Sequence, residues 1–171
     1  MRTQTVGGVR QATAEPAREQ IKFKYLEALT LIERLHRRLL DVIKDDFERH
    51  GEPEVNPVQA LLLFNIGDAE LTAGELKTRG HYQGSNVSYN LKKLVEAGYV
   101  NHERSASDKR SVRVRLTERG QAIRSRVDAL YNRQLHAVEE VVGLSVEEFE
   151  RLNKALTRLE RFWTDQILYR L

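Results

Sequence analysis

Residues 85–120 read SNVSYNLKKLVEAGYVNHERSASDKRSVRVRLTERG, and the spacing of apolar residues changes halfway along this stretch. Over 87–95, apolar residues recur every three or four positions, which is typical of a helix with one buried face. Over 112–116, valine and leucine alternate with arginine, which is the pattern of a half-buried strand. A shorter apolar-polar run at 99–103 precedes it, and the loop between them is polar. The stretch therefore predicts a short helix followed by a β-hairpin.

Two more helix starts lie upstream of this stretch. Residues 56–59, NPVQ, combine an N-cap asparagine, a first-turn proline and the glutamine of a capping box, which predicts a core helix over 57–65. Residues 72–75, TAGE, repeat the capping-box pattern and predict a helix of two turns that ends near residue 80. Three short helices are therefore expected before the hairpin.

Long helices are expected on both sides of this unit. Residues 16–51 contain a first-turn proline but no later proline or glycine before Gly51, which predicts one long helix. Thr117 is expected to cap a helix that ends at Gly143, and residues 145–148, SVEE, to open a last helix. The first fifteen residues hold little that packs, so we expect a mobile tail that is either inert or touches DNA.

The composition excludes several classes of protein. The 171 residues include 28 Lys and Arg against 25 Asp and Glu, and no cysteine, so disulfides, thiolate zinc sites and cysteine nucleophiles are ruled out. The five histidines lack paired-ligand spacing, and hydrolase and phosphate-binding motifs are missing, so we expect no metal, no cofactor and no enzyme activity. Without a signal-like or membrane-length apolar run, the expected location is cytoplasmic.

Positive charge is concentrated in one segment of the chain. Residues 75–120 contain ten Lys or Arg and five Asp or Glu, whereas the remainder is slightly negative. A segregated basic segment on a short helix and a hairpin suits the neutralisation of phosphates along a duplex. An ordinary solvated face explains the charge alone equally well.

The helix expected at 85–97 favours DNA binding more strongly. Asparagine can pair with adenine, serine and tyrosine hydroxyls can reach base edges or phosphates, and lysine supplies charge, so such a face suits a helix in a major groove. A plain solvent-facing helix would more often mix Glu with Lys, and only Glu96 is acidic here. The polar outer face consists of Ser85, Asn86, Ser88, Tyr89, Asn90, Lys92 and Lys93.

Two motifs point to a family. Residues 108–110 are an Asp-x-Arg in the hairpin loop, and residues 116–120 are a Leu-Thr-Glu-x-Gly segment. With Glu75-Leu76, Val87-Ser88, residues 91–94, Gly98-Tyr99-Val100, Arg104 and residues 112–116, they resemble the winged helix-turn-helix of the MarR family of bacterial transcription regulators. The chain departs from the family at residues 80–82, where a hydrophobic plug is usual. Within the family it is similar to alphaproteobacterial regulators of cell-wall L,D-transpeptidases.

The resemblance implies a fold and a set of roles. The fold would be mainly α with a small β-hairpin wing, a winged helix-turn-helix flanked by long dimerisation helices. The chain would be a homodimeric, ligand-responsive regulator of pseudo-palindromic duplex DNA, with residues 85–93 as the recognition helix. Arg104, Lys109, Arg110 and Arg113 would form the wing. Asp108 would support Arg110 by a charge-assisted hydrogen bond, although Ser-Asp is also a common turn former.

The outer helices predict a dimer independently of the family. They carry more apolar surface than a small winged helix can cover, so a second copy would bury it, and Phe162, Trp163 and Tyr169 are interface candidates. The expected organisation is a tail at 1–15, a dimerisation region at 16–51 and 121–171, and a DNA-binding region at 52–120, all in one integrated domain. A monomeric bundle, or a protein-binding adaptor without DNA, remains the alternative.

A small-molecule pocket is expected where the dimer helices meet the DNA-binding unit. An aromatic wall with a few polar groups suits a hydrophobic or phenolic effector, which would change the spacing of the two recognition helices. Core packing alone also explains the apolar candidates, whereas an imidazole on an apolar stripe calls for a partner. The candidates are His36, Leu39, Leu40, Ile43, Leu61, Phe64 and Tyr131.

Overall fold

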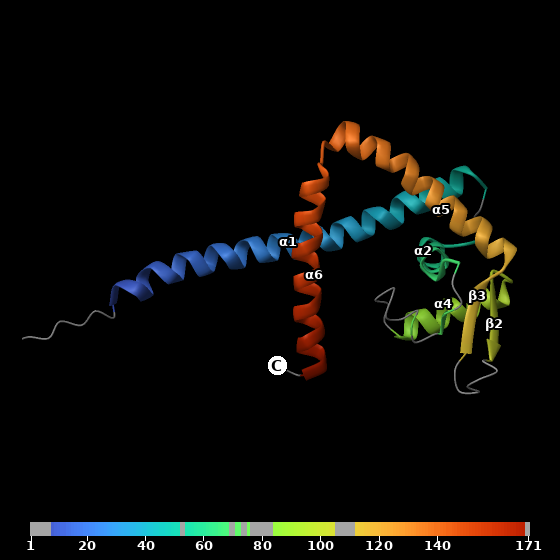
Figure 1. Ribbon diagram of the computed structural model, residues 1–171, viewed down its shortest axis with the longest axis horizontal. Coiled ribbons are helices and arrows are strands. Elements are labelled where there is room, and N and C mark those ends of the chain that lie inside the picture. The colour runs from blue at the N-terminus through green and yellow to red at the C-terminus, as the bar shows by residue number, and fades with distance from the viewer. Residues whose placement is uncertain are drawn as a thin grey trace, which may run out of the picture.

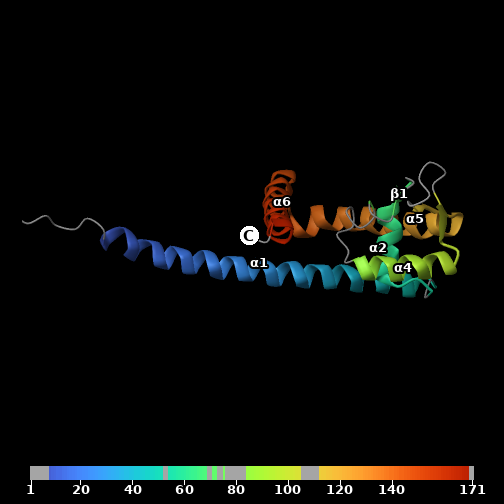
Figure 2. The same ribbon diagram turned by 90° about the horizontal axis from the view of Figure 1, so that it is seen from below.

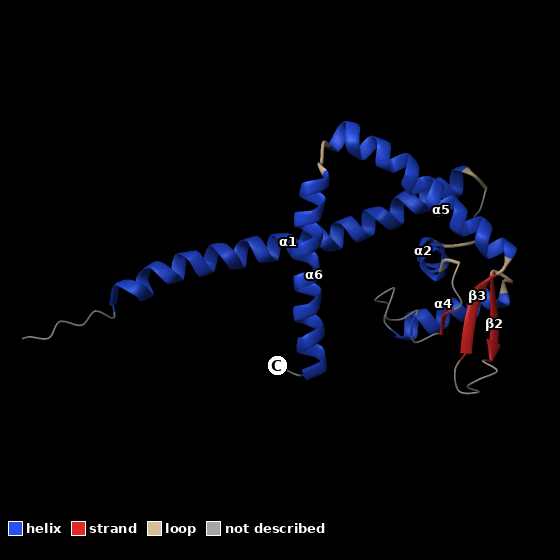
Figure 3. Cartoon of the chain, viewed as in Figure 1, coloured by secondary structure: helices blue, strands red, loops and turns tan. Residues whose placement is uncertain are grey.

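The computed structural model describes residues 8–51, 54–68, 71–72, 75, 84–104 and 112–169. Most of the chain is helical, with a small sheet at one end (Figure 3), which confirms the expected mainly α fold with a hairpin wing. The elements in order are α1 (Gly8–Arg49), α2 (Pro57–Ile66), β1 (Leu71–Thr72), α4 (Gly84–Glu96), β2 (Val100–Arg104), β3 (Val112–Leu116), α5 (Glu118–Ala137), a π-helical segment (Val138–Val142) and α6 (Val146–Tyr169).

The molecule consists of a lobe and a set of outer helices. The lobe contains α2, α4 and the β2–β3 hairpin, with the C-terminal part of α1 and most of α5 beside it (Figure 1). The N-terminal half of α1 extends away from the lobe, and the views show only α6 crossing the helix there (Figures 1 and 2). Helix α6 crosses α1 and contacts it where the Trp163 indole N–H donates to the Tyr25 hydroxyl at 3.3 Å.

Helix α1 begins earlier than the sequence predicts. It starts at Gly8 and runs through Pro16, so the expected tail to residue 15 and the first-turn role of Pro16 are wrong. The tail was inferred from the lack of residues that pack. Residues 10–15, RQATAE, nevertheless consist mostly of good helix formers, and local propensity can extend a helix without a packing partner. Residues 1–7 lie outside the described part of the chain.

Helix α2 forms as its capping pattern predicts. The Asn56 side chain accepts from the Gln59 amide at 2.9 Å, and the Gln59 side chain accepts from the Asn56 amide at 3.2 Å. The helix is the centre of the lobe, because Leu62, Leu63 and Ile66 are almost completely buried. The end of α1 supplies Ile43 and Phe47 to the same core, and α5 supplies Val127 and Leu130.

A three-stranded sheet closes the other side of the lobe. Its order is β1-β3-β2, and both pairings are antiparallel. The alternation in β3 is confirmed, since Val114 and Leu116 are buried whereas Arg113 and Arg115 are exposed. Strand β1, which pairs Leu71 with Val114, was not predicted, because two residues are too few to display a period. The helix expected from residue 72 lies mostly outside the described residues.

The outer helices differ from the lobe in how little of their surface is covered. Helix α5 continues into the π-helical segment, which ends at Gly143 with a left-handed φ of 66°, as the glycine predicted. The capping box of α6 also forms, with Ser145 and Glu148 exchanging side chain to backbone hydrogen bonds. However, none of the 24 residues of α6 is buried within this chain.

One buried carboxylate joins α1 to α5. Asp46 is 9% exposed, and the Arg133 guanidinium donates to its Oδ1 at 2.5 Å. This ion pair links the end of the long helix directly to α5.

Candidate nucleic-acid interface

Helix α4 has a buried apolar face and a solvent-facing polar face. Val87, Leu91 and Leu94 are buried in the lobe, as the helical spacing predicted. Ser88, Lys92 and Lys93 are exposed and Tyr89 is 63% exposed, whereas Asn90 is half-buried. Residues 85 and 86 belong to the helix backbone, but the Ser85 and Asn86 side chains lie outside the described part. The described predicted residues therefore form one outer surface of α4, with Asn90 at its edge.

The lysines of this surface form ion pairs with Glu96. Lys92 Nζ lies 3.8 Å and Lys93 Nζ 3.0 Å from the carboxylate. The hydrogen bond from Lys93 raises the pKa of Lys93 and lowers the pKa of Glu96. Both groups are thus charged at neutral pH. Because these ion pairs are exposed, a phosphate can compete for the lysines at little cost.

The structure describes only part of the predicted wing. Arg113 is exposed on β3, where its Cα partner across the ladder is Glu103, and Arg115 stands opposite Asn101. Arg104 is the last residue of β2, and its side chain is outside the described part. Asp108, Lys109 and Arg110 belong to residues 105–111, which are also outside it. Their predicted roles, including the support of Arg110 by Asp108, stay predictions.

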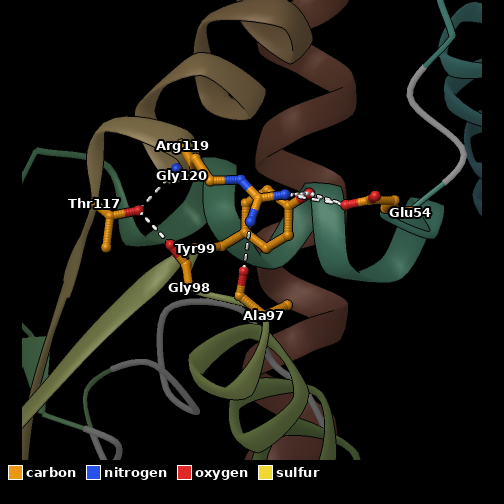
Figure 4. Close-up of polar contacts among 7 residues, drawn as sticks. All are labelled: Glu54, Ala97, Gly98, Tyr99, Thr117, Arg119 and Gly120. Carbon is orange, nitrogen blue, oxygen red and sulfur yellow. Dashed lines mark hydrogen bonds and ion pairs between the residues drawn. The ribbon is translucent and has the colours of Figure 1, made fainter.

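A polar cluster that the sequence did not reveal lies at the base of the wing (Figure 4). The Arg119 guanidinium lies 4.4 Å from the centre of the Tyr99 ring and donates hydrogen bonds to the Ala97 carbonyl and to Glu54. In the sequence, Arg119 counted only as one more positive charge. The sequence indicated only that one helix stops at Gly98 and that another is capped by Thr117. It did not indicate that these two ends meet.

The predicted effector residues come together only in part. Phe64 and Tyr131 pack edge to face with ring centres 5.1 Å apart, and Leu39 and Leu40 pack against the same core. Ile43 and Leu61 are buried in that core. Close packing thus accounts for these six residues in the chain by itself.

His36 lies apart from the other effector candidates in the chain by itself. Its side chain is exposed, although it lies on the same helical face as Leu39, Leu40 and Ile43. Along this face of α1 the cover decreases from the buried Ile43 to the half-buried Leu39, and it ends before His36. His36 therefore lies outside the core that holds the other candidates.

Two absences are notable in the residues that the structure describes. No group of three His, Asp or Glu side chains among them is placed to hold a metal ion. None of their helices is both long and apolar enough to cross a lipid bilayer.

Comparison with known proteins defines the class of the lobe. Residues 55–120 match the family described as a winged helix DNA-binding domain. The chain is also 42% identical, over 99 residues, to the exopolysaccharide II synthesis transcriptional activator ExpG of Rhizobium meliloti (strain 1021). That match covers 58% of this chain and 51% of the activator, so the chain aligns with about half of the length of this relative.

Two solved structures align with most of this chain. A mutant MarR from E. coli complexed with operator DNA aligns with a TM-score of 0.64 and 24% identity, over 80% of this chain and 95% of that one. Streptococcus pneumoniae FabT in complex with DNA aligns with a TM-score of 0.64 and 21% identity, over 82% and 98%. The lobe is therefore a winged helix domain. The chain has the fold of the MarR regulators to which it is similar, as its sequence predicted.

Proposed function

We propose that this chain is a homodimeric transcription regulator that binds duplex DNA with α4 and the β2–β3 wing. The observation that carries the proposal is α4, whose apolar face is buried in a winged helix lobe and whose outer face presents Ser88, Tyr89, Lys92 and Lys93. Such a helix can enter a major groove by its N-terminal end while the wing reaches the adjacent backbone. Two of the similar solved structures are complexes with DNA, which supports the same partner here.

The dimer follows from the uncovered surface of the outer helices. Helix α6 exposes a row of large apolar side chains, of which Trp163 is 37% and Ile167 78% exposed. Ile21 and Leu26 are also exposed, on the N-terminal half of α1. A second copy would cover these faces, with residues 16–51 and 121–171 forming the dimerisation region and 52–120 the DNA-binding region of one integrated domain. The two α4 helices would then read half-sites about 10 base pairs apart.

A gel shift with operator-sized duplexes selected from a random pool tests DNA binding. We expect Lys92→Ala to weaken binding to every sequence and to reduce the salt slope by about one, because Lys92 would neutralise a phosphate. We expect Asn90→Ala to change the preferred sequence instead, because an amide can pair with a base. Lys154→Ala is the control, since Lys154 is a similarly exposed lysine paired with a glutamate one turn away on α6.

The outcome separates the regulator from a protein-binding adaptor. Equal losses by Lys92→Ala and Asn90→Ala on selected and random DNA would contradict base reading by α4. No shift of any duplex at low salt would favour an adaptor that uses its outer helices.

We further propose that a hydrophobic or phenolic effector opposes DNA binding. The half-buried Phe64 and Tyr131 pair lies where α2 meets α5, and opening this contact would change the angle between the lobe and the outer helices. A panel of aromatic acids and phenols should contain a compound that releases DNA, and Phe64→Ala should reduce its potency. The proposal fails if no compound releases DNA or if the variant responds like the wild type. The L,D-transpeptidase resemblance stays a prediction.

A further inference from the structure

The end of α4 leaves the Ala97 carbonyl for another element to satisfy. The Tyr99 amide donates to the Leu94 carbonyl at 2.9 Å and the Gly98 amide to the Val95 carbonyl at 3.0 Å, with Gly98 at a φ of 76°. This pair of bonds is the Schellman motif, which closes a helix but gives no donor to the carbonyl of the last residue before the glycine. That carbonyl belongs to Ala97, and it accepts from Arg119 Nη1 at 2.9 Å.

Arg119 is held in place from three directions. Its guanidinium lies over the ring of Tyr99, which is only 3% exposed and is therefore a fixed platform. Its Nη2 donates to the Tyr99 hydroxyl at 3.1 Å and to Glu54 at 3.0 Å. The Tyr99 hydroxyl donates to the same Glu54 carboxylate at 3.3 Å. A planar group with several fixed donors suits this geometry, whereas a lysine could satisfy only part of it.

The cluster joins the recognition helix to the outer helices (Figure 4). Glu54 lies in the segment between α1 and α2, Ala97 follows α4, and Arg119 lies in the first turn of α5. Thr117 adds a second link, because its hydroxyl donates to the Gly98 carbonyl at 2.8 Å and accepts from the Gly120 amide at 3.2 Å. These contacts tie the C-terminal end of α4 directly to the first turn of α5.

We propose that Arg119 is a positioning residue for DNA reading: it fixes the direction of α4 relative to α5, and so the register in which the dimer reads its two half-sites. The inference rests on the proposed function and assigns Arg119 no contact with DNA. Its role is geometric and not mainly stabilising, because the side chains of Arg119 and Glu54 are 58% and 70% exposed, and an ion pair so exposed adds little to stability.

The test uses Arg119→Lys in the full chain, because this variant retains the charge but loses the planar donor group. A duplex selected by the wild type is compared with random duplex and with duplexes whose half-sites are one base pair closer or further apart. Arg158→Lys, an exposed residue of α6, is the matched control. We expect Arg119→Lys to bind the selected duplex about tenfold more weakly, a loss comparable to one mismatched base pair, while its affinity for random duplex is unchanged.

The preference among half-site spacings should also become flatter in the variant. Equal weakening on selected and random duplex, with a smaller salt slope, would mean that Arg119 contacts a phosphate and would overturn the proposal. Unchanged selectivity would overturn it as well, even if the melting temperature fell.

Hydrogen exchange tests the contact between Arg119 and the end of α4 without DNA. Arg119→Lys should speed exchange of the Gly98 and Tyr99 amides, whose bonds close α4, and leave the amide of the buried Val127 protected as in the wild type. Unchanged exchange at Gly98 and Tyr99 would contradict the proposal. If the wild type itself selects no DNA, the proposed function fails, and exchange still decides whether Arg119 fixes the end of α4.

Discussion

Gly120→Ala is expected to destabilise the lobe by about 3 kcal/mol or more. A Cβ at residue 120 would lie 2.2 Å from the Tyr99 carbonyl oxygen and 3.3 Å from the Leu116 Cβ. The carbonyl cannot retreat freely, because it accepts a hydrogen bond from the Thr117 amide at 3.1 Å. The direction of the effect is informative, since Gly to Ala within a helix normally stabilises by up to about 1 kcal/mol.

Urea unfolding followed by circular dichroism measures this change. Gly143→Ala is the matched control, because Gly143 has a left-handed φ of 66° but a Cβ there would meet nothing within 4 Å. The control should lose about 1 kcal/mol from backbone strain alone. If the Gly120→Ala protein were as stable as the wild type, α5 would not approach the Tyr99 carbonyl as closely as the structure shows.

Trp163→Asp is expected to convert the dimer into a monomer that keeps a folded lobe. The Trp163 indole is 37% exposed in its own chain and lies in the row of apolar side chains on α6. A side chain that only stabilised its own chain would be buried there. In the dimer the indole would be covered, so a carboxylate there should raise the dimer dissociation constant by about a hundredfold or more, the range of interface hot spots. Because one lobe alone would contact a single half-site, operator binding should fall with it.

Sedimentation velocity across a range of concentrations measures the dimer directly. Trp163→Phe is the conservative control and should remain largely dimeric, since it retains an apolar ring. A wild type that sediments as a monomer would contradict the proposed dimer. A Trp163→Asp protein that remains a dimer would contradict the proposed interface.

Local patterns in the sequence predicted the elements that depend on local chemistry. The capping box at Asn56 and the alternation over 112–116 each depend on neighbouring residues, and both form as expected. The face of α4 followed from helical spacing for the same reason. By contrast, the exposure of His36 in the single chain could not be predicted, because it depends on how far the lobe extends along α1 and the spacing of residues within one helix does not give that distance.

Tertiary contacts account for the rest. Arg119 bonds residues 22 and 65 positions away, and no pattern around residue 119 identifies those partners. Strand β1 exists because β3 offers Leu71 and Thr72 a ladder, not because two residues favour extended structure. The start of α1 was missed for another reason, since the absence of packing residues was taken for the absence of helix.

The absence of a buried residue from α6 makes the order of this helix depend on the protein concentration. Because no residue of α6 is buried in its own chain, packing against that chain stabilises the helix little. Most of its stabilisation would then come from the second copy. By mass action, dilution would then both separate the dimer and loosen α6. A newly made chain would stay inactive until enough copies accumulate, and occupancy of a target site would rise more steeply than in proportion to protein concentration.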